Sequence, residues 1–228
     1  MPPKKKAKQA EPEYELTYWN VRGRAEPIRL TLTVAGLKWK EVHLNDELYA
    51  DLKKKAGTAD LPFGQWPTLK EGDVVLSQTQ AICKHIARKH GMYGARNKME
   101  DYIVDAVMLG CDELRHKFYA AKMHENKEKE LSAFEKNHLD PESKIGKNDG
   151  AHLAYLEGFL ERSETPWVAG GKNLSVADIF LFTLYEILVG QFDEEKIKKN
   201  YPKIAENVKA LSEVEEVAEY LKGERFPN

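Results

Sequence analysis

The sequence is short of cysteine, of long apolar runs and of net charge, and each shortage excludes a class of protein. Its only cysteines, Cys83 and Cys111, lie far apart, which excludes a disulfide framework and favours a reducing compartment such as the cytoplasm. No apolar stretch approaches the roughly 20 residues that a membrane-spanning helix needs, so we expect no membrane partner. The formal net charge of -2 provides no field that would attract nucleic acid.

The N-terminal residues 1–13 lack apolar periodicity and consist mainly of Pro, Lys, Ala and Glu. We expect a disordered basic tail there. Its lysines are not followed by an apolar segment, so the pattern is not that of a secretory signal. Residues 4–8 are read either as a solvated extension or as a nuclear import address.

The remaining length and a hydrophobic content of 42% suit two packed domains. Residues 14–92 predict a small mixed-sheet domain of βαβ–ββα order. A strand from Tyr14 is followed by a turn, a helix that Pro27 opens, and a strand from about Trp39 to Leu44. Residues 45–64 are polar, and we expect them to be irregular. A hairpin turning at 71–73 and a helix beginning at Gln78 complete the domain.

After a linker at 93–98, residues 99–228 have helical apolar periodicity. Ser175 and Asp178 form a capping-box pattern ahead of an apolar run. Residues 124–150 are highly charged, and we expect loops or frayed helix there. The fold class predicted is therefore α/β plus all-α.

A cleft between the two domains is the natural place for a ligand. Tyr18 ends the first strand, at the carboxyl edge where ligands bind to such sheets. Arg22 and Arg24 offer positive charge to carboxylates, and Gly23 permits close backbone approach. Residues 78–79 begin a helix, whose N-terminal N–H groups bind anions. These features favour a carboxylate ligand with a reacting group near a tyrosine, although a tyrosine at a strand end is commonly structural.

Five ordered segments carry a resemblance to a known family. They read LTYWNVRGRAEPIR (16–29), PFGQWP (62–67), SQTQAI (77–82), VD with DELR (104–105 and 112–115), and LSVAD (174–178). Together they resemble the tyrosine-type cytosolic glutathione transferases, most closely the pi and sigma classes. Pro67 falls where the family has a cis proline, an isomer that the sequence alone leaves open.

The resemblance implies a thioredoxin-like N-terminal domain, an all-helical second domain, and a cytoplasmic homodimer that acts in detoxification. It makes glutathione the co-substrate, without a metal, Tyr18 the thiol activator, and Arg24 its electrostatic support. The residues that it implies for glutathione binding are Tyr49, Lys53, Gln65, Trp66, Pro67, Gln78, Thr79 and Glu113. We expect the electrophile pocket to contain Trp19, Val21, Tyr119 and Met123, and Phe63 to lie at the dimer interface.

Three positions depart from the family pattern. Tyr49 replaces a usual tryptophan, and Glu113 stands where many members have an aspartate that reaches the partner subunit's glutathione. The segment after Tyr49 looks longer than usual, so Lys54 or Lys55 is an alternative to Lys53. The chain has no long apolar C-terminal helix, and we therefore expect an open site with a broad substrate range.

The chemistry that this implies is thiol activation. A free thiol titrates near pH 8.5, so little thiolate exists at neutral pH. A phenol ordinarily stays protonated to about pH 10 and favours the thiolate by donating a hydrogen bond to it. Alternative readings are a glutathione-dependent isomerase of the sigma type, a non-catalytic lens-type or ligand-carrying member of the fold, and a nucleic-acid adaptor suggested only by the basic tail.

Overall fold

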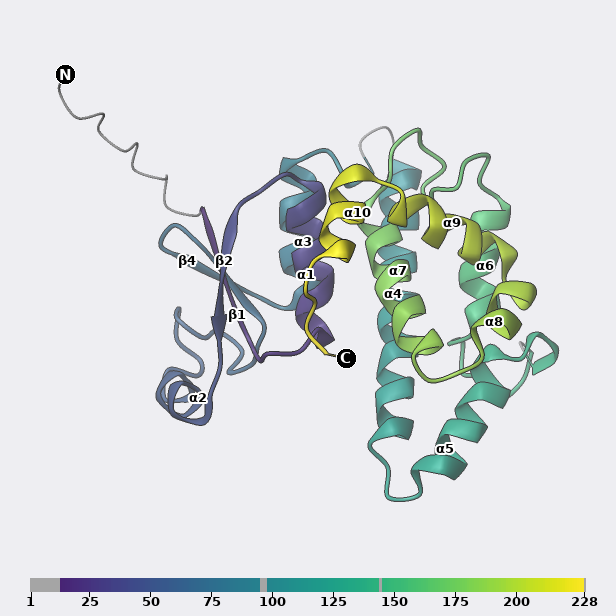
Figure 1. Ribbon diagram of the computed structural model, residues 1–228, viewed down its shortest axis with the longest axis horizontal. Coiled ribbons are helices and arrows are strands. Elements are labelled where there is room, and N and C mark those ends of the chain that lie inside the picture. Colours follow the sequence, from purple (N-terminus) through teal and green to yellow (C-terminus); the bar gives the residue numbers. More distant parts are fainter. Residues whose placement is uncertain (1–12, 95–97, 144, 228) are drawn as a thin grey trace.

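The computed structural model describes residues 13–94, 98–143 and 145–227 of the 228-residue chain (Figure 1). The basic tail expected at 1–13, with its possible import address, lies outside this part apart from Glu13. So do residues 95–97 of the expected linker.

The N-terminal lobe is built on a four-stranded sheet. Its strands are β1 (Tyr14–Tyr18), β2 (Trp39–His43), β3 (Thr68–Glu71) and β4 (Val74–Ser77), in the order β2-β1-β3-β4. β1 and β2 are parallel, whereas β3 is antiparallel to both of its neighbours. This confirms the predicted βαβ–ββα order and brings the end of β1 next to the start of β3.

Helices α1 (Glu26–Val34) and α3 (Thr79–Lys89) lie between the sheet and the helical lobe (Figure 1). Pro27 occupies the first turn of α1, as predicted. Most of α1 is buried, because it contacts α3, α7 (Val176–Val189) and α10 (Glu215–Lys222) as well as the sheet side. A short 3₁₀ turn at Gly23–Ala25 connects β1 to α1.

The expectation of irregular structure at 45–64 is wrong in its first half. Helix α2 spans Asp46–Lys53, and the side chain of Asn45 caps it by accepting a hydrogen bond from the Leu48 backbone at 2.8 Å. Asp46 and Glu47 in its first turn complement the helix dipole. These were available helix-start signals. The helix has no fully buried residue, and its apolar face is short, consisting of the half-buried Leu48, Tyr49 and Leu52.

The C-terminal lobe is helical. Besides α7 and α10 it contains α4 (Lys98–Lys122), α5 (Lys127–Phe134), α6 (Leu153–Glu161), α8 (Glu194–Asn200) and α9 (Pro202–Ser212). The charged segment 124–150 is more ordered than expected, since α5 continues into a π-helical turn at Glu135–Leu139 and a 3₁₀ turn at Pro141–Ser143. Within the described ranges, no helix is both long enough and apolar enough to cross a bilayer.

The predicted capping box is present at the start of the central helix α7. The Asp178 carboxylate is completely buried and accepts from the Ser175 backbone at 2.6 Å and from its hydroxyl at 2.8 Å. It also accepts from the Val168 backbone at 2.8 Å and from the Asn207 side chain at 2.7 Å. One carboxylate therefore connects α7 to the preceding loop and to α9.

Both cysteines are free and have no exposed surface. Cys83 lies on α3 and Cys111 on α4, inside the core that the two lobes share. Burial raises the pKa of the Cys83 thiol to about 12 and raises that of Cys111 as well. Neither thiol is a nucleophile at neutral pH.

Candidate active site

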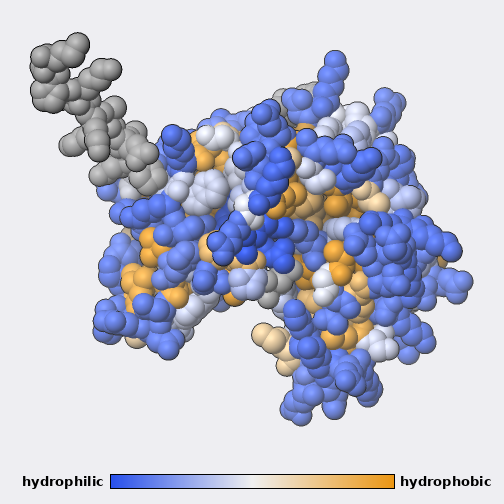
Figure 2. Space-filling view, viewed as in Figure 1, coloured by the Kyte–Doolittle hydropathy of each residue, from blue (hydrophilic) through white to orange (hydrophobic). Residues whose placement is uncertain are grey.

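A polar cleft of about 570 Å³ lies between the lobes. Figure 2 shows the molecule hollowed between the parts that Figure 1 labels α2 and α4. The residues that line the cleft are Arg24, Tyr49, Lys53, Gly64, Gln65, Trp66, Pro67, Gln78, Thr79, Asp112 and His116. Eight of these were predicted site residues.

Tyr18 stands at the end of β1 beside this cleft, held by the turn that follows the strand. The Arg24 backbone N–H donates to the Tyr18 Oη at 3.2 Å. A Cβ atom at Gly23, where φ is +41°, would come within 2.8 Å of the same oxygen, so the turn requires glycine there. A phenol has one proton to donate, and no described residue accepts it from Tyr18. The proton is therefore available to a ligand.

The start of α3 forms a second wall. Gln78 adopts φ 72° and ψ 111°, a conformation that few residues other than glycine adopt and that occurs disproportionately at functional sites. The Thr79 hydroxyl donates to the Arg24 carbonyl at 3.0 Å and so connects α3 to the turn beside Tyr18. The Trp66–Pro67 peptide bond is cis, the isomer that the sequence left open.

A cluster of aromatic rings forms the side of the cleft next to α2. Tyr49 lies between Trp19 and Trp66, with ring-centroid distances of 5.6 and 5.1 Å. The Lys53 ammonium lies 5.9 Å from the Tyr49 ring and 5.7 Å from the Trp66 ring, and it donates to the Gly64 carbonyl. Lys53 is therefore held in the cleft.

The two alternative lysines point elsewhere. Lys54 pairs with Asp51, and Lys55 pairs with Asp60. Of the three candidates, Lys53 is the one that lines the cleft.

Helix α4 contributes two cleft residues that the sequence reasoning missed. The Asp112 carboxylate accepts from the Gln80 side chain at 2.6 Å, and the His116 ring nitrogen lies 2.5 Å from the Arg24 guanidinium. Asp112 and His116 are four residues apart and therefore lie on the same face of α4, which is the one sequence signal that could have pointed to them. Glu113, which was predicted, is exposed on α4 and does not line this chain's cleft.

The four electrophile-pocket candidates lie outside the set of residues that line the polar cleft. Tyr119 is half-buried, burial raises its pKa, and the Tyr18 hydroxyl is close enough to add to that effect. Met123, just after α4, is 83% exposed. Trp19 contacts Tyr49 in the aromatic cluster, and Val21 is half-buried in the turn after β1.

Arg22 does not offer its charge to a cleft ligand as the sequence suggested. Its guanidinium lies 3.5 Å from the Glu186 carboxylate of α7, whereas Arg24 lines the cleft. The two arginines flank Gly23, and the turn directs them to different sides.

Comparison with known proteins identifies the family of this chain. Family models for the N-terminal and C-terminal domains of glutathione S-transferase match residues 14–88 and 112–224. Glutathione S-transferase P 1 of Xenopus laevis is 34% identical over 219 residues, which is 93% of either chain. The chain belongs to the glutathione S-transferase family. It is therefore a transferase that conjugates glutathione to electrophiles.

Solved structures agree on the fold of this transferase. The pi-class glutathione S-transferase of Onchocerca volvulus has a TM-score of 0.76 and 27% identity, covering 92% of each chain. A glutathione S-transferase of the hookworm Necator americanus, described as monomeric, has a TM-score of 0.74 and 21% identity, covering 92% of this chain and 96% of its own. The second likeness concerns the fold alone.

Proposed function

We propose that Tyr18 activates the glutathione thiol by donating a hydrogen bond from its phenol hydroxyl to the sulfur, which favours the thiolate. The observation that carries this is the hydrogen bond from the Arg24 N–H to the Tyr18 Oη, which orients the phenol and leaves its proton for a ligand. Stabilising the thiolate lowers the thiol pKa, and each unit corresponds to about 1.4 kcal/mol. The test is the pH profile of a Tyr18→Phe enzyme.

We propose that the cleft holds the peptide part of glutathione by complementary charge. Glutathione carries two carboxylates and one ammonium group. Arg24 and Lys53 are the cations of the cleft, and Asp112 is its carboxylate. The Gln65 side chain and the cis Trp66–Pro67 segment supply polar groups between them. Asp112 joins the predicted set as the candidate partner of the ammonium group.

Gln78→Ala is expected to weaken glutathione binding while the bound thiol titrates normally. The side chain would lose a hydrogen bond to a charged ligand group, at a cost of about 1.5–3 kcal/mol. Gln78→Glu, nearly isosteric but anionic, should weaken binding further by repelling the ligand carboxylate. Calorimetric titration of both variants checks this. Wild-type affinity in both would mean that Gln78 does not bind the γ-glutamyl group of glutathione, which is the group that we assign to it.

We also propose that the electrophile enters from the side of Tyr119 and Met123 and that the substrates are mostly apolar. The Tyr18 hydroxyl is close enough to Tyr119 to contribute to raising its pKa, and the exposed Met123 leaves that side open. Two free, buried cysteines suit a reducing compartment, in keeping with work in the cytoplasm.

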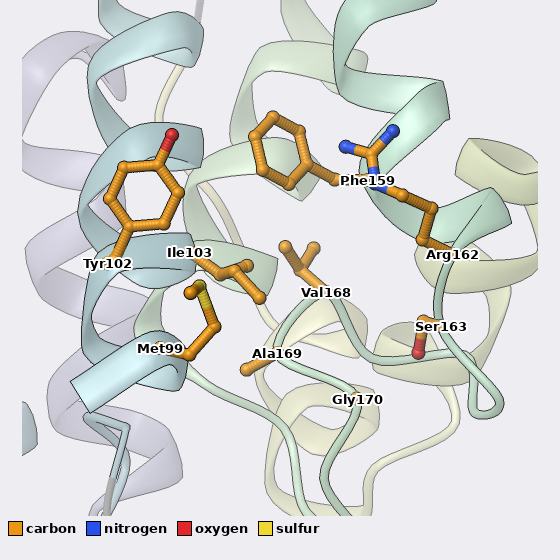
Figure 3. A pocket seen from close by; sticks show the side chains of 9 residues that line it. All are labelled: Met99, Tyr102, Ile103, Phe159, Arg162, Ser163, Val168, Ala169 and Gly170. Carbon is orange, nitrogen blue, oxygen red and sulfur yellow. The ribbon is translucent and has the colours of Figure 1, made fainter. Parts of the chain in front are cut away.

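We propose that the transferase forms a homodimer in which Phe63 is an interface residue. The Phe63 ring is 63% exposed on the loop before the cis proline. On the other lobe, Tyr102 and Leu109 expose apolar surface along α4. A mainly apolar cavity of about 340 Å³, which Tyr102 helps to line, lies between α4, α6 and the 168–170 loop (Figure 3). Figure 3 shows the rings of Tyr102 and Phe159 on opposite sides of it. An aromatic ring of a second copy would suit this apolar lining.

Phe63→Ser is expected to shift the protein toward monomers. Truncating a well-buried aromatic contact costs about 2 kcal/mol, and a two-fold interface contains the contact twice. Sedimentation velocity over a dilution series checks this, with Phe63→Tyr as the matched control that keeps the ring. A wild-type monomer, as described for the hookworm protein, would refute the dimer, whereas an unaltered Phe63→Ser dimer would remove Phe63 from the interface.

A further inference from the structure

The C-terminal residues of the chain return to the turn that carries the Tyr18 contact. In Figure 1 the yellow segment after α10 runs beside α1 and ends next to the start of that helix. The Arg22 backbone N–H donates to the Pro227 carbonyl at 2.8 Å. The Phe226 ring lies 4.4 Å beneath the Arg29 guanidinium and 5.3 Å from the His43 ring. Residues 223–227 therefore pack on the N-terminal lobe although they follow the last helix of the other lobe.

Arg225 fixes this segment through two carboxylates from different lobes. Its guanidinium contacts Glu186 of α7 twice, at 2.7 Å each, and Glu26 of α1 at 2.6 Å. Glu186 also lies 3.5 Å from the Arg22 guanidinium. Because Arg22 belongs to the turn after β1, the Arg225–Glu186 pair reaches that turn directly.

Arg29 holds the same turn from the side of α1. Its completely buried guanidinium donates to the Val21 carbonyl at 3.1 Å and to the Arg22 carbonyl at 3.3 Å. It also pairs with Glu26 and with Glu41 of β2. Three arginines and three glutamates thus form one charge-balanced network, and removing one partner of such a pair leaves an uncompensated buried charge.

We infer that Arg225 is a positioning residue for Tyr18: by fixing the turn after β1, it keeps the Arg24 N–H on the phenol oxygen. The chain of contacts runs from Arg225 through Glu186 to Arg22, and two residues further along the backbone to Arg24. A phenol that loses this hydrogen bond is free to rotate away from the sulfur. The inference rests on the proposed role of Tyr18, and Arg225 itself does not line the cleft.

The experiment measures the titration of the glutathione thiol bound to each variant, by ultraviolet absorbance of the thiolate, together with kcat and the glutathione Kd. Arg225→Ala removes the ion pairs with Glu26 and Glu186. Arg225→Lys keeps the positive charge but lacks the guanidinium that can bind both carboxylates at once. Truncation after Arg225 keeps the ion pairs and removes residues 226–228, including the Phe226 ring and the Pro227 carbonyl that accepts from Arg22. Lys222→Ala is the matched control, because it removes an exposed cation at the end of α10, three residues before Arg225.

Arg225→Ala is expected to raise the pKa of the bound thiol by about one unit, which lowers the thiolate fraction and kcat about tenfold below the titration midpoint. The Kd at a pH below that midpoint should change less than about twofold, because the cleft residues are untouched and the protonated thiol is the form that binds. Arg225→Lys and the truncation should give smaller shifts in the same direction, and Lys222→Ala none.

A merely structural role predicts a lower melting temperature with an unshifted thiol titration, and that result would overturn the inference. If Arg225→Ala does not fold, the titration of the bound thiol in the truncated chain and in Arg225→Lys tests the inference instead. A shift in Tyr18→Phe without one in the Arg225 variants would overturn only the positioning role. Unshifted titrations in both would overturn the role of Tyr18 as well.

Discussion

Replacing Tyr18 by phenylalanine is expected to lower turnover about 100-fold, at a pH below the titration midpoint of the bound wild-type thiol, while leaving the glutathione Kd at that pH nearly unchanged. Loss of a single well-placed donor to a developing or bound anion costs about 2.7–4 kcal/mol in comparable sites. The substitution removes only the hydroxyl that the Arg24 N–H orients, and the tripeptide would still be held by the cleft. The bound thiol should therefore titrate about two units higher, which corresponds to about 2.7 kcal/mol.

The sign of the pH effect follows from which form the phenol stabilises. A donor to the sulfur favours the thiolate, so its loss moves the rise of the pH–rate profile to higher pH and leaves the alkaline plateau closer to wild type. Tyr14→Phe is the matched control, because Tyr14 lies on the same strand and its hydroxyl bonds to Glu71 at the other end. Wild-type turnover in Tyr18→Phe would refute the proposed mechanism.

Asp178→Ala is expected to lower the free energy of unfolding by about 4 kcal/mol. Losses of this size are typical of mutations that break a buried hydrogen-bond network. The carboxylate receives hydrogen bonds from Ser175, Val168 and Asn207, so its removal leaves buried donors without an acceptor, at about 1–3 kcal/mol each. The helix that it caps is the most buried of the C-terminal lobe. Urea unfolding followed by circular dichroism measures the change.

Two milder variants separate the cap from the wider network. Ser175→Ala removes only the hydroxyl bond and should cost about 1 kcal/mol, and Asp178→Asn keeps the shape and one acceptor oxygen and should fall between the two. If Asp178→Ala cost no more than Ser175→Ala, the bonds to Val168 and Asn207 would contribute nothing to stability.

The sequence predicted the elements that have strong local signals. Alternation in β1, Pro27 at the start of α1, the turn at 71–73 and the Ser175–Asp178 box each lie where expected. Helix α2 was missed because its apolar face is short and only half-buried, so its cap and first-turn acids are its clearest signals. Periodicity is a weak guide to a helix with so few apolar residues.

The candidate site was predictable where one segment supplies several residues and not where distant segments meet. Residues 65–67 and 78–79 lie together in the cleft as the motifs implied. Asp112 and His116 reach it only because α4 packs across the domain boundary, and no local pattern fixes that packing. The same holds for Arg22, whose partner Glu186 is 164 residues away in sequence.

The burial of both cysteines has a consequence for the durability of the catalyst. A transferase that gathers reactive electrophiles beside a thiolate risks alkylating any thiol of its own within reach. Cys83 and Cys111 are the only thiols of the chain, and both are sealed in the shared core with their pKa values raised. The folded protein therefore presents its substrates with one kind of thiol, that of glutathione, and a labelling reagent that finds two thiols is counting unfolded molecules.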